Sequence, residues 1–193
     1  MYNVIITAKG GINLFEHLKE IIYDKDLQIE AYRFNGVAQA FPNHFHEYYV
    51  IGLIEAGERC LTVNNNKYEI GPGDLMTFNP MDNHACEQTD GESLRYRCLN
   101  MKPEIMQEIA REVLGCDELP QFQEAVQYQT KHAGTFCKLH NSIMNGGGPQ
   151  LEKEECLLLF MKEFLSGHAA FGSNKTQSVF RKEIKDVCAF LQQ

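Results

Sequence analysis

The chain has 193 residues, which is enough for one domain with a buried core or for a domain with an added helical module. Its formal net charge is -8, and an acidic chain is poorly suited to coat a phosphate backbone, which excludes direct DNA binding by this stretch. The seven cysteines form no CxxC pair, which excludes a zinc ribbon, and no apolar run is long enough to cross a membrane, so we expect a cytoplasmic protein.

The first hundred residues are dominated by short, apolar, strand-like runs. Residues 1–27 have no clear pattern, although NLFEHLKEIIY (13–23) is compatible with a short helix. The strand-like runs that follow are QIEAYRF (28–34), EYYVIGLI (47–54), RCLTV (59–63), KYEI (67–70), DLMTF (74–78) and SLRYRCLNM (93–101). Turn residues separate them. Many short strands at this spacing predict a closed or nearly closed antiparallel barrel over residues 1–101.

After Pro103 the apolar period becomes helical. Helices are predicted over 103–115, 134–148, 149–167 and 176–193, and Gly115 and Gly167 serve as stop signals. The last helix ends in the middle of its apolar pattern, without a stop signal. We therefore expect a helical region over 102–193 behind a barrel, so the fold class is mainly β with α.

Histidines gather at the start of the longest apolar run. In a strand alternate residues share a face, so His44, His46 and Tyr48 are expected to point the same way, with Glu47 on the opposite face. His84 follows a later strand and a turn at Pro80. Two imidazoles from one strand and a third from a neighbouring strand would form an open three-nitrogen metal site.

The stretch from 41 to 87 resembles the cupin superfamily, but it departs from the pattern of metal-dependent cupins. The His44-Phe45-His46 run fits the first cupin motif, whose metal-binding glutamate would fall at Val50 or Ile51. Neither of those side chains can bind a metal. The turn glycine of the second motif is also missing, and His84 comes early in it.

A more specific resemblance, over residues 37–101, is to the N-terminal effector-binding domain of AraC-type transcription regulators. It rests on PNHFH (42–46) followed by EYYVIGLIEAG (47–57), on GPGDLMTFNPMDNH (71–84), and on Arg95-Tyr96-Arg97. The resemblance implies a cupin-like double-stranded β-helix that binds a small metabolite, followed by a helical dimerisation region and a linker helix. It also implies a homodimer that reaches DNA only through a C-terminal helix-turn-helix domain absent from this chain.

These patterns predict an effector site and leave its chemistry open. The predicted effector-binding residues are His44, His46, Tyr48, His84 and Arg97. An arginine inside the barrel would suit an anionic effector, whereas pairing with Glu or Asp is the other interpretation of Arg97. We expect no catalysis and no cofactor. The alternative is a free-standing metal-dependent cupin enzyme, an isomerase or dioxygenase, with His44, His46 and His84 as ligands of a divalent metal.

Overall fold

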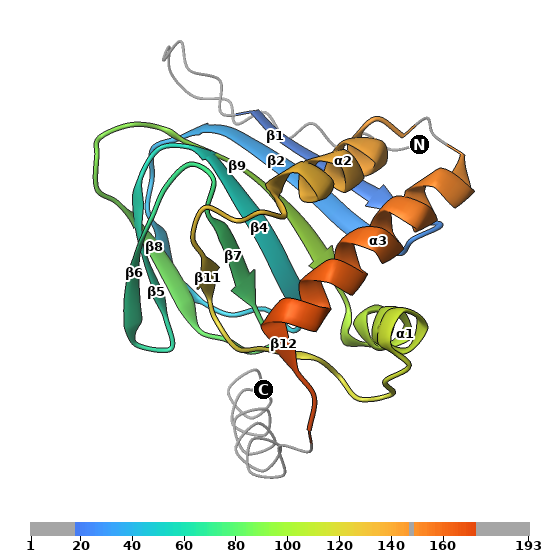
Figure 1. Cartoon of the computed structure of the whole chain (residues 1–193). Coiled ribbons are helices and arrows are strands. Elements are labelled where there is room, and N and C mark those ends of the chain that lie inside the picture. Colours follow the sequence, from blue (N-terminus) through green and yellow to red (C-terminus); the bar gives the residue numbers. More distant parts are fainter. Residues whose placement is uncertain (1–17, 147–148, 173–193) are drawn as a thin grey trace, which may run out of the picture.

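The computed structural model describes residues 18–146 and 149–172 and shows two larger antiparallel sheets, a two-stranded sheet and three helices (Figure 1). In chain order the elements are β1 (Leu18–Asp24), β2 (Ile29–Val37), β3 (Phe41–His44), β4 (Tyr49–Ala56), β5 (Arg59–Val63), β6 (Asn66–Ile70), β7 (Leu75–Phe78), β8 (His84–Gln88), β9 (Leu94–Met101), α1 (Pro103–Leu114), β10 (Gln121–Phe122), β11 (Val126–Gln127), α2 (Ala133–Met144), α3 (Gln150–His168) and β12 (Ala169–Ala170).

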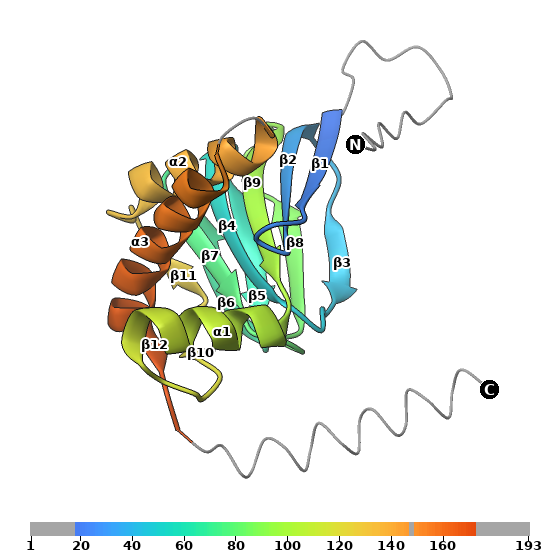
Figure 2. The same cartoon turned by 90° about the vertical axis from the view of Figure 1, so that its right-hand side faces the viewer.

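The two larger sheets face each other and form the barrel. One has six strands in the order β1-β2-β9-β4-β7-β11, and the other has four in the order β3-β8-β5-β6. All their strand pairs are antiparallel. The three helices lie together on the outer side of the six-stranded sheet (Figure 2). The prediction of a mainly β, cupin-like barrel with helices added behind it is therefore confirmed.

Strand β4 of the six-stranded sheet is buried on both of its faces. Its residues from Tyr49 to Ile54 are all buried, because the barrel interior lies on one face and the helices lie on the other. Tyr49, Ile51 and Leu53 belong to the core shared with the helices, whereas Val50 and Ile54 belong to the core inside the barrel. The double-sided apolar character of this run is what a strand buried on both faces requires.

The helices begin and end close to where their sequences predict. Helix α1 starts at Pro103 and is capped by Gly115, whose φ of 67° places it in the left-handed region that glycine adopts without strain. Helix α3 continues one residue past Gly167. Its buried Lys153 ammonium donates to the Asp24 carboxylate at 2.6 Å, which fastens the helix to the end of β1.

Two predictions of local structure need correction. The segment expected as a short helix contains β1 over Leu18–Asp24, because pairing with β2 along seven residues overrides the weak helical pattern. Residues after 101 are not purely helical, since β11 returns to the six-stranded sheet beside β7 and β10 pairs with β12. The predicted helix 176–193 lies outside the described residues.

Helix α2 is attached to the six-stranded sheet by polar contacts. The His140 Nε2–H donates to the Tyr32 carbonyl at 3.0 Å. The Asn141 side-chain oxygen accepts from Arg97 at 2.9 Å and from Arg33 at 3.3 Å, and Arg97 also pairs with Glu55. Burial and the neighbouring guanidinium groups lower the pKa of His140 to about 4, so this imidazole is neutral at pH 7.

We predict that His140 makes stability depend on pH. Because its pKa in the fold is about 4 and that of an unfolded histidine is about 6.5, the unfolded chain binds more protons between these values. Its contribution to the free energy of unfolding is thus fully present above pH 6.5 and is lost as the pH falls toward 4, by up to about 3 kcal/mol. Urea denaturation of the wild type and of His140→Gln across this range measures it.

The control for this prediction compares how steeply the free energy of unfolding changes with pH in the wild type and in His140→Gln. Burial also lowers the pKa of His46, His84 and His132, and these groups give a slope of the same sign in both proteins. Only the extra slope of the wild type belongs to His140. Identical pH slopes in the two proteins would contradict the prediction.

Candidate functional site

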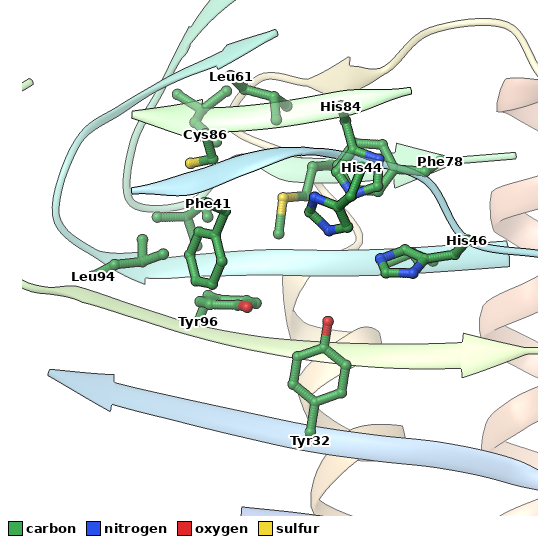
Figure 3. A pocket seen from close by; sticks show the side chains of 14 residues that line it. Tyr32, Phe41, His44, His46, Leu61, Phe78, His84, Cys86, Leu94 and Tyr96 are labelled. Carbon is green, nitrogen blue, oxygen red and sulfur yellow. The ribbon is translucent and has the colours of Figure 1, made fainter. Parts of the chain in front are cut away.

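A cavity lies inside the barrel, between the two sheets (Figure 3). It has about 60 Å³ of free volume. Its lining comes from both sheets and from the bend between β3 and β4: Tyr32, Phe41, His44, His46, Val50, Ile54, Leu61, Ile70, Met76, Phe78, His84, Cys86, Leu94 and Tyr96. The wall contains three imidazoles and two phenols and is otherwise apolar apart from the Cys86 thiol.

The wall of the cavity contains no Asp, Glu, Lys or Arg side chain. Burial raises the pKa of Tyr32 and of Tyr96, so both remain phenols at pH 7, and the Tyr32 hydroxyl points toward the histidines (Figure 3). Burial also raises the pKa of the Cys86 thiol to about 11, which keeps it protonated. The cavity therefore offers phenol, thiol and imidazole groups for hydrogen bonds, but no carboxylate, ammonium or guanidinium group.

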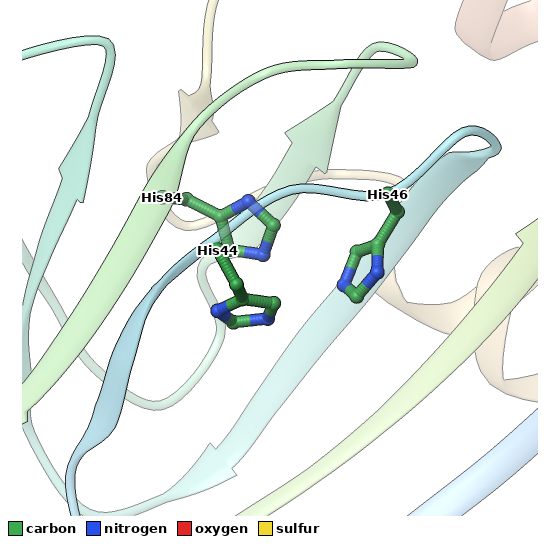
Figure 4. A group of neighbouring side chains, drawn as sticks. All are labelled: His44, His46 and His84. Carbon is green, nitrogen blue, oxygen red and sulfur yellow. The ribbon is translucent and has the colours of Figure 1, made fainter. Parts of the chain in front are cut away.

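Three histidines form the polar end of the cavity (Figure 4). His44 ends β3 and lies directly opposite His84, the first residue of β8, in the register of the four-stranded sheet. His46 follows in the bend before β4. One ligand nitrogen from each ring lies within 4.8 Å of those of the other two. The prediction that His44, His46 and His84 lie close together is thus confirmed.

Backbone contacts fix the tautomers of two of these rings. The Nδ1 of His44 lies 2.6 Å from the Pro42 carbonyl, and the Nδ1 of His84 lies 3.0 Å from the Asp82 carbonyl. A carbonyl can only accept, so each Nδ1 carries the proton and each Nε2 keeps a lone pair. Burial lowers the pKa of His84, and burial with the neighbouring imidazoles lowers the pKa of His46 to about 4.

The three imidazoles fit a divalent transition metal as nitrogen ligands. Neutral imidazole suits zinc, iron, nickel and copper, and histidine ligands often donate their second ring N–H to a backbone carbonyl, as His44 and His84 do. A carboxylate ligand has no counterpart here. Val50 lines the cavity with an apolar side chain, and Ile51 packs toward the helices.

The structure places two of the predicted site residues elsewhere. Tyr48 stacks on His46, with ring centroids 4.7 Å apart, but is not part of the cavity wall, because the strand ends at His44 and the chain bends before Tyr48. Arg97 lies on the opposite face of β9 from Tyr96 and contacts Glu55 and Asn141. The expected inward-facing arginine is therefore replaced by the alternative, an ion pair with a carboxylate.

Sequence reasoning missed most of the aromatic wall, including Tyr32, Phe41, Phe78 and Tyr96. A signal was present on β9, where Leu94, Tyr96 and Cys98 alternate with Arg95 and Arg97. The sequence analysis placed Arg97 inside the barrel, which assigned the wrong face of β9 to the cavity. A shift of one residue exchanges the two faces of a strand.

Gly52 leaves room for two cross-strand side chains, one of which lines the cavity. Its cross-strand neighbours are Met76 on β7 and Cys98 on β9. A Cβ at position 52 would lie 2.6 Å from the Cys98 Sγ and 2.7 Å from the Met76 Cε. Both contacts are too short, so a side chain here would push Met76, which lines the cavity.

We predict that Gly52→Ala destabilises the fold by roughly 1–3 kcal/mol, because overpacking a filled core forces its neighbours to move. Gly134→Ala in α2 is the matched control, since a Cβ there meets nothing within 4 Å. That change should shift stability by at most about 1 kcal/mol, in the stabilising direction. Urea unfolding at pH 7 compares the two, and an unchanged midpoint for Gly52→Ala would refute the prediction.

The fold and the cavity together define a cupin-type barrel with a cavity between its two sheets. The chain belongs to the family of the AraC-like ligand binding domain, whose model matches residues 26–161. It is also 41% identical, over 170 residues, to an uncharacterized HTH-type transcriptional regulator, YbfI, of Bacillus subtilis (strain 168). That alignment covers 88% of this chain and 62% of the relative, so the chain spans less than two thirds of that protein's length.

Solved structures similar to this chain include cupin proteins. A cupin 2 conserved barrel domain protein from Rhodopseudomonas palustris is 17% identical with a TM-score of 0.42, over 51% of this chain and 71% of that one. An RmlC-like cupin family protein from Methanocaldococcus jannaschii is 13% identical with a TM-score of 0.38, over 51% of this chain and 94% of that one. No helix in the described part of the chain is long and apolar enough to span a membrane.

Proposed function

We propose that this chain is the ligand-sensing and dimerisation domain of a cytoplasmic AraC-type transcription regulator. The observation that supports it most is a cavity inside the barrel of a ligand-binding family, lined by hydrogen-bonding groups and an apolar wall. The relative named as an HTH-type regulator supports the same role. DNA binding would belong to a helix-turn-helix part outside this chain, in keeping with the net charge of -8.

The strands that line the cavity also hold α2, which offers a route for the signal. On β2, Tyr32 lines the cavity while its carbonyl accepts from His140 of α2. On β9, Tyr96 lines the cavity, and the next residue, Arg97, donates to Asn141 of α2. An effector that moves β2 or β9 would therefore change the position of α2 on the sheet. It would favour one of two positions of this helix.

A second candidate function, a metal-dependent cupin enzyme, is favoured by the three converging histidines. Against it, the cavity wall contains no carboxylate that could act as metal ligand or general base, and the Cys86 thiol is protonated at neutral pH. We therefore propose a site that binds without catalysing a reaction.

The effector site is tested by filling the cavity. In a thermal-shift screen of small sugars, amino acids and organic acids, we expect at least one compound to raise the unfolding temperature of the wild type. Ile54→Phe should abolish that shift, because Ile54 faces the cavity and the larger ring would occupy it. Lys162→Ala, at an exposed position on α3, is the control and should keep it. A shift that survives in Ile54→Phe would contradict the assigned site.

Dimerisation is proposed through the outer side of α3. Leu151 and Leu158, seven residues apart, share one face of this helix, and Leu159 lies beside them. Leu151 is 76% exposed and Leu159 is 53% exposed, while Leu158 lines an open groove between α1 and α3 together with Ile105 and Leu157. The groove also contains acidic residues, among them Glu108 and Glu112, so the apolar part of this surface is its leucines. Exposed leucines on one side of a helix are typical of a protein–protein contact surface.

We predict that the double change Leu151→Lys and Leu159→Lys converts a dimer into a monomer, because it places two like charges and their copies in the interface. Sedimentation velocity at several concentrations measures the mass. The control is Lys162→Ala, which removes an exposed charge from the same helix and should leave the dimer intact. A monomeric wild type at 0.1 mM, or a dimeric double variant, would refute this interface.

A further inference from the structure

A second pocket lies outside the barrel cavity, between the β5–β6 hairpin, the turn after β7 and the segment 121–125. Its free volume is about 180 Å³, against about 60 Å³ for the cavity, and the two share no lining residue. An engineered cavity of roughly 150 Å³ holds a six-membered ring. The pocket therefore has room for a compound of that size, and the barrel cavity does not.

The lining of this pocket is mostly polar. Nine of its twelve side chains are polar, namely five amides, two hydroxyls and two carboxylates. Amide and hydroxyl groups both donate and accept hydrogen bonds, as the hydroxyl groups of a ligand do. The composition is thus the reverse of that of the barrel cavity, whose wall is largely apolar.

One wall of the pocket is held in place by its own hydrogen bonds. The Asn79 side-chain amide donates to the Phe122 carbonyl at 3.1 Å, and its oxygen accepts from the Phe122 N–H at 2.8 Å. The Asp82 carboxylate accepts from the Asn64 amide at 3.0 Å and from the Asn79 N–H at 2.8 Å. These groups form a fixed wall, and both oxygens of Asp82 are already occupied.

Other lining side chains are uncommitted. In the part of the chain that the structure describes, the side chains of Asn66, Tyr68, Gln121 and Glu124 make no hydrogen bond or ion pair. Asn66 and Tyr68 belong to β6, whereas Gln121 and Glu124 belong to the segment 121–125. Two amides, a phenol and a carboxylate from two separate segments are therefore available to one ligand between them.

The charges of the pocket exclude other ligand classes. No lysine, arginine or histidine lines it, and its two carboxylates would repel an anion. A cation would find one uncommitted carboxylate, that of the exposed Glu124, because the Asp82 oxygens accept from N–H groups. An apolar compound would cover polar groups without replacing their hydrogen bonds, which is unfavourable.

We propose that this pocket binds a neutral six-membered ring that carries several hydroxyl groups, such as a cyclitol or a hexopyranose. The amides of Asn66 and Gln121 donate to and accept from its hydroxyls, and the Glu124 carboxylate accepts from a third. The Tyr68 ring contacts the carbon face of the ligand. The site is separate from the effector cavity of the proposed function and does not depend on it.

A ligand in this pocket would also fix the end of α3. Strand β10, which starts the segment 121–125, pairs with β12, which directly follows α3. The Gln123 N–H donates to the carbonyl of His168, the last residue of α3, at 3.2 Å. A ring bound between β6 and the segment 121–125 therefore holds the end of this helix against the barrel.

The first experiment titrates the full chain by calorimetry with myo-inositol and with glucose. At least one of them should bind at a single site. Cyclohexanol, a ring of the same size with one hydroxyl, and a phosphorylated glucose should bind far more weakly. Absence of binding by both polyols overturns the proposal. Cyclohexanol, cyclohexylamine or the phosphorylated sugar binding as tightly as the polyols overturns the ligand class.

The second experiment removes two of the uncommitted groups. Asn66→Ala with Glu124→Gln should weaken polyol binding roughly tenfold, since each lost hydrogen bond weakens binding severalfold. The matched control is Asn145→Ala with Glu118→Gln, at exposed positions outside the pocket, and it should bind as the wild type does. Unfolding midpoints are recorded first to show that both proteins fold. Equal affinity in the two double variants overturns the site.

Hydrogen–deuterium exchange tests the link to α3. The bound polyol should slow backbone exchange in residues 121–125 and 168–170. Binding without slower exchange in 168–170 overturns the link to the helix. Slower exchange confined to β2 and β9 would place the ligand in the barrel cavity and overturn the pocket.

One further variant separates this inference from the proposed function. Ile54→Phe fills the barrel cavity and should bind the polyol as tightly as the wild type. Loss of polyol binding in Ile54→Phe overturns the pocket and supports the cavity. The screen for the cavity effector is run in the Asn66→Ala, Glu124→Gln protein, so that a compound bound in the pocket is not mistaken for it. Each site can then fail without the other.

Discussion

The six-stranded sheet is buried on both faces, and this constraint organises the whole molecule. Helices α1, α2 and α3 cover its outer face, and its inner face is closed by the four-stranded sheet. Because successive side chains on a strand point to opposite faces, each of its central strands contributes to two cores at once. On β4 one set of residues packs under the helices, and the intervening set forms the barrel interior. A change on one face is therefore felt on the other through a shared backbone.

The same alternation of side chains along β2 and β9 places the contacts to α2 next to the residues of the cavity wall. Tyr32 and Tyr96 line the cavity, while their neighbours Arg33 and Arg97 reach outward to Asn141 of α2. Arg33 and Arg97 lie directly opposite each other in the register of β2 and β9. The polar contacts of α2 are thus one residue away from the cavity wall. In the proposed sensor, this arrangement would carry small movements of the cavity wall to α2.

Burial sets the chemistry of the site. The pKa values of His46 and His84 are lowered, and those of Tyr32, Cys86 and Tyr96 are raised, so that each of these groups is held in its neutral form at pH 7. A cavity lined by neutral groups discriminates between ligands by their shape and by hydrogen bonding.

Much of the architecture was predictable from local pattern. The barrel strands and the first helices follow from apolar periodicity, from Pro103 and from Gly115, which act within a few residues of their own position. The convergence of His44, His46 and His84 was predictable from their place in the motifs. The helix expected over 13–23 failed at β1, because a long-range pairing with β2 outweighed a weak local preference.

The sequence by itself determined most of the barrel strands and the helices α1 to α3, since period and turn residues are local properties of the chain. It also determined that a cluster of imidazoles would begin the longest buried run. Only the tertiary structure decided which face of β9 looks inward, and so placed Tyr96 in the cavity and Arg97 on α2. It likewise moved Tyr48 out of the wall at the end of β3. The reason is that strand register and strand ends are set by partners far away in sequence, and a shift of one residue inverts every assignment.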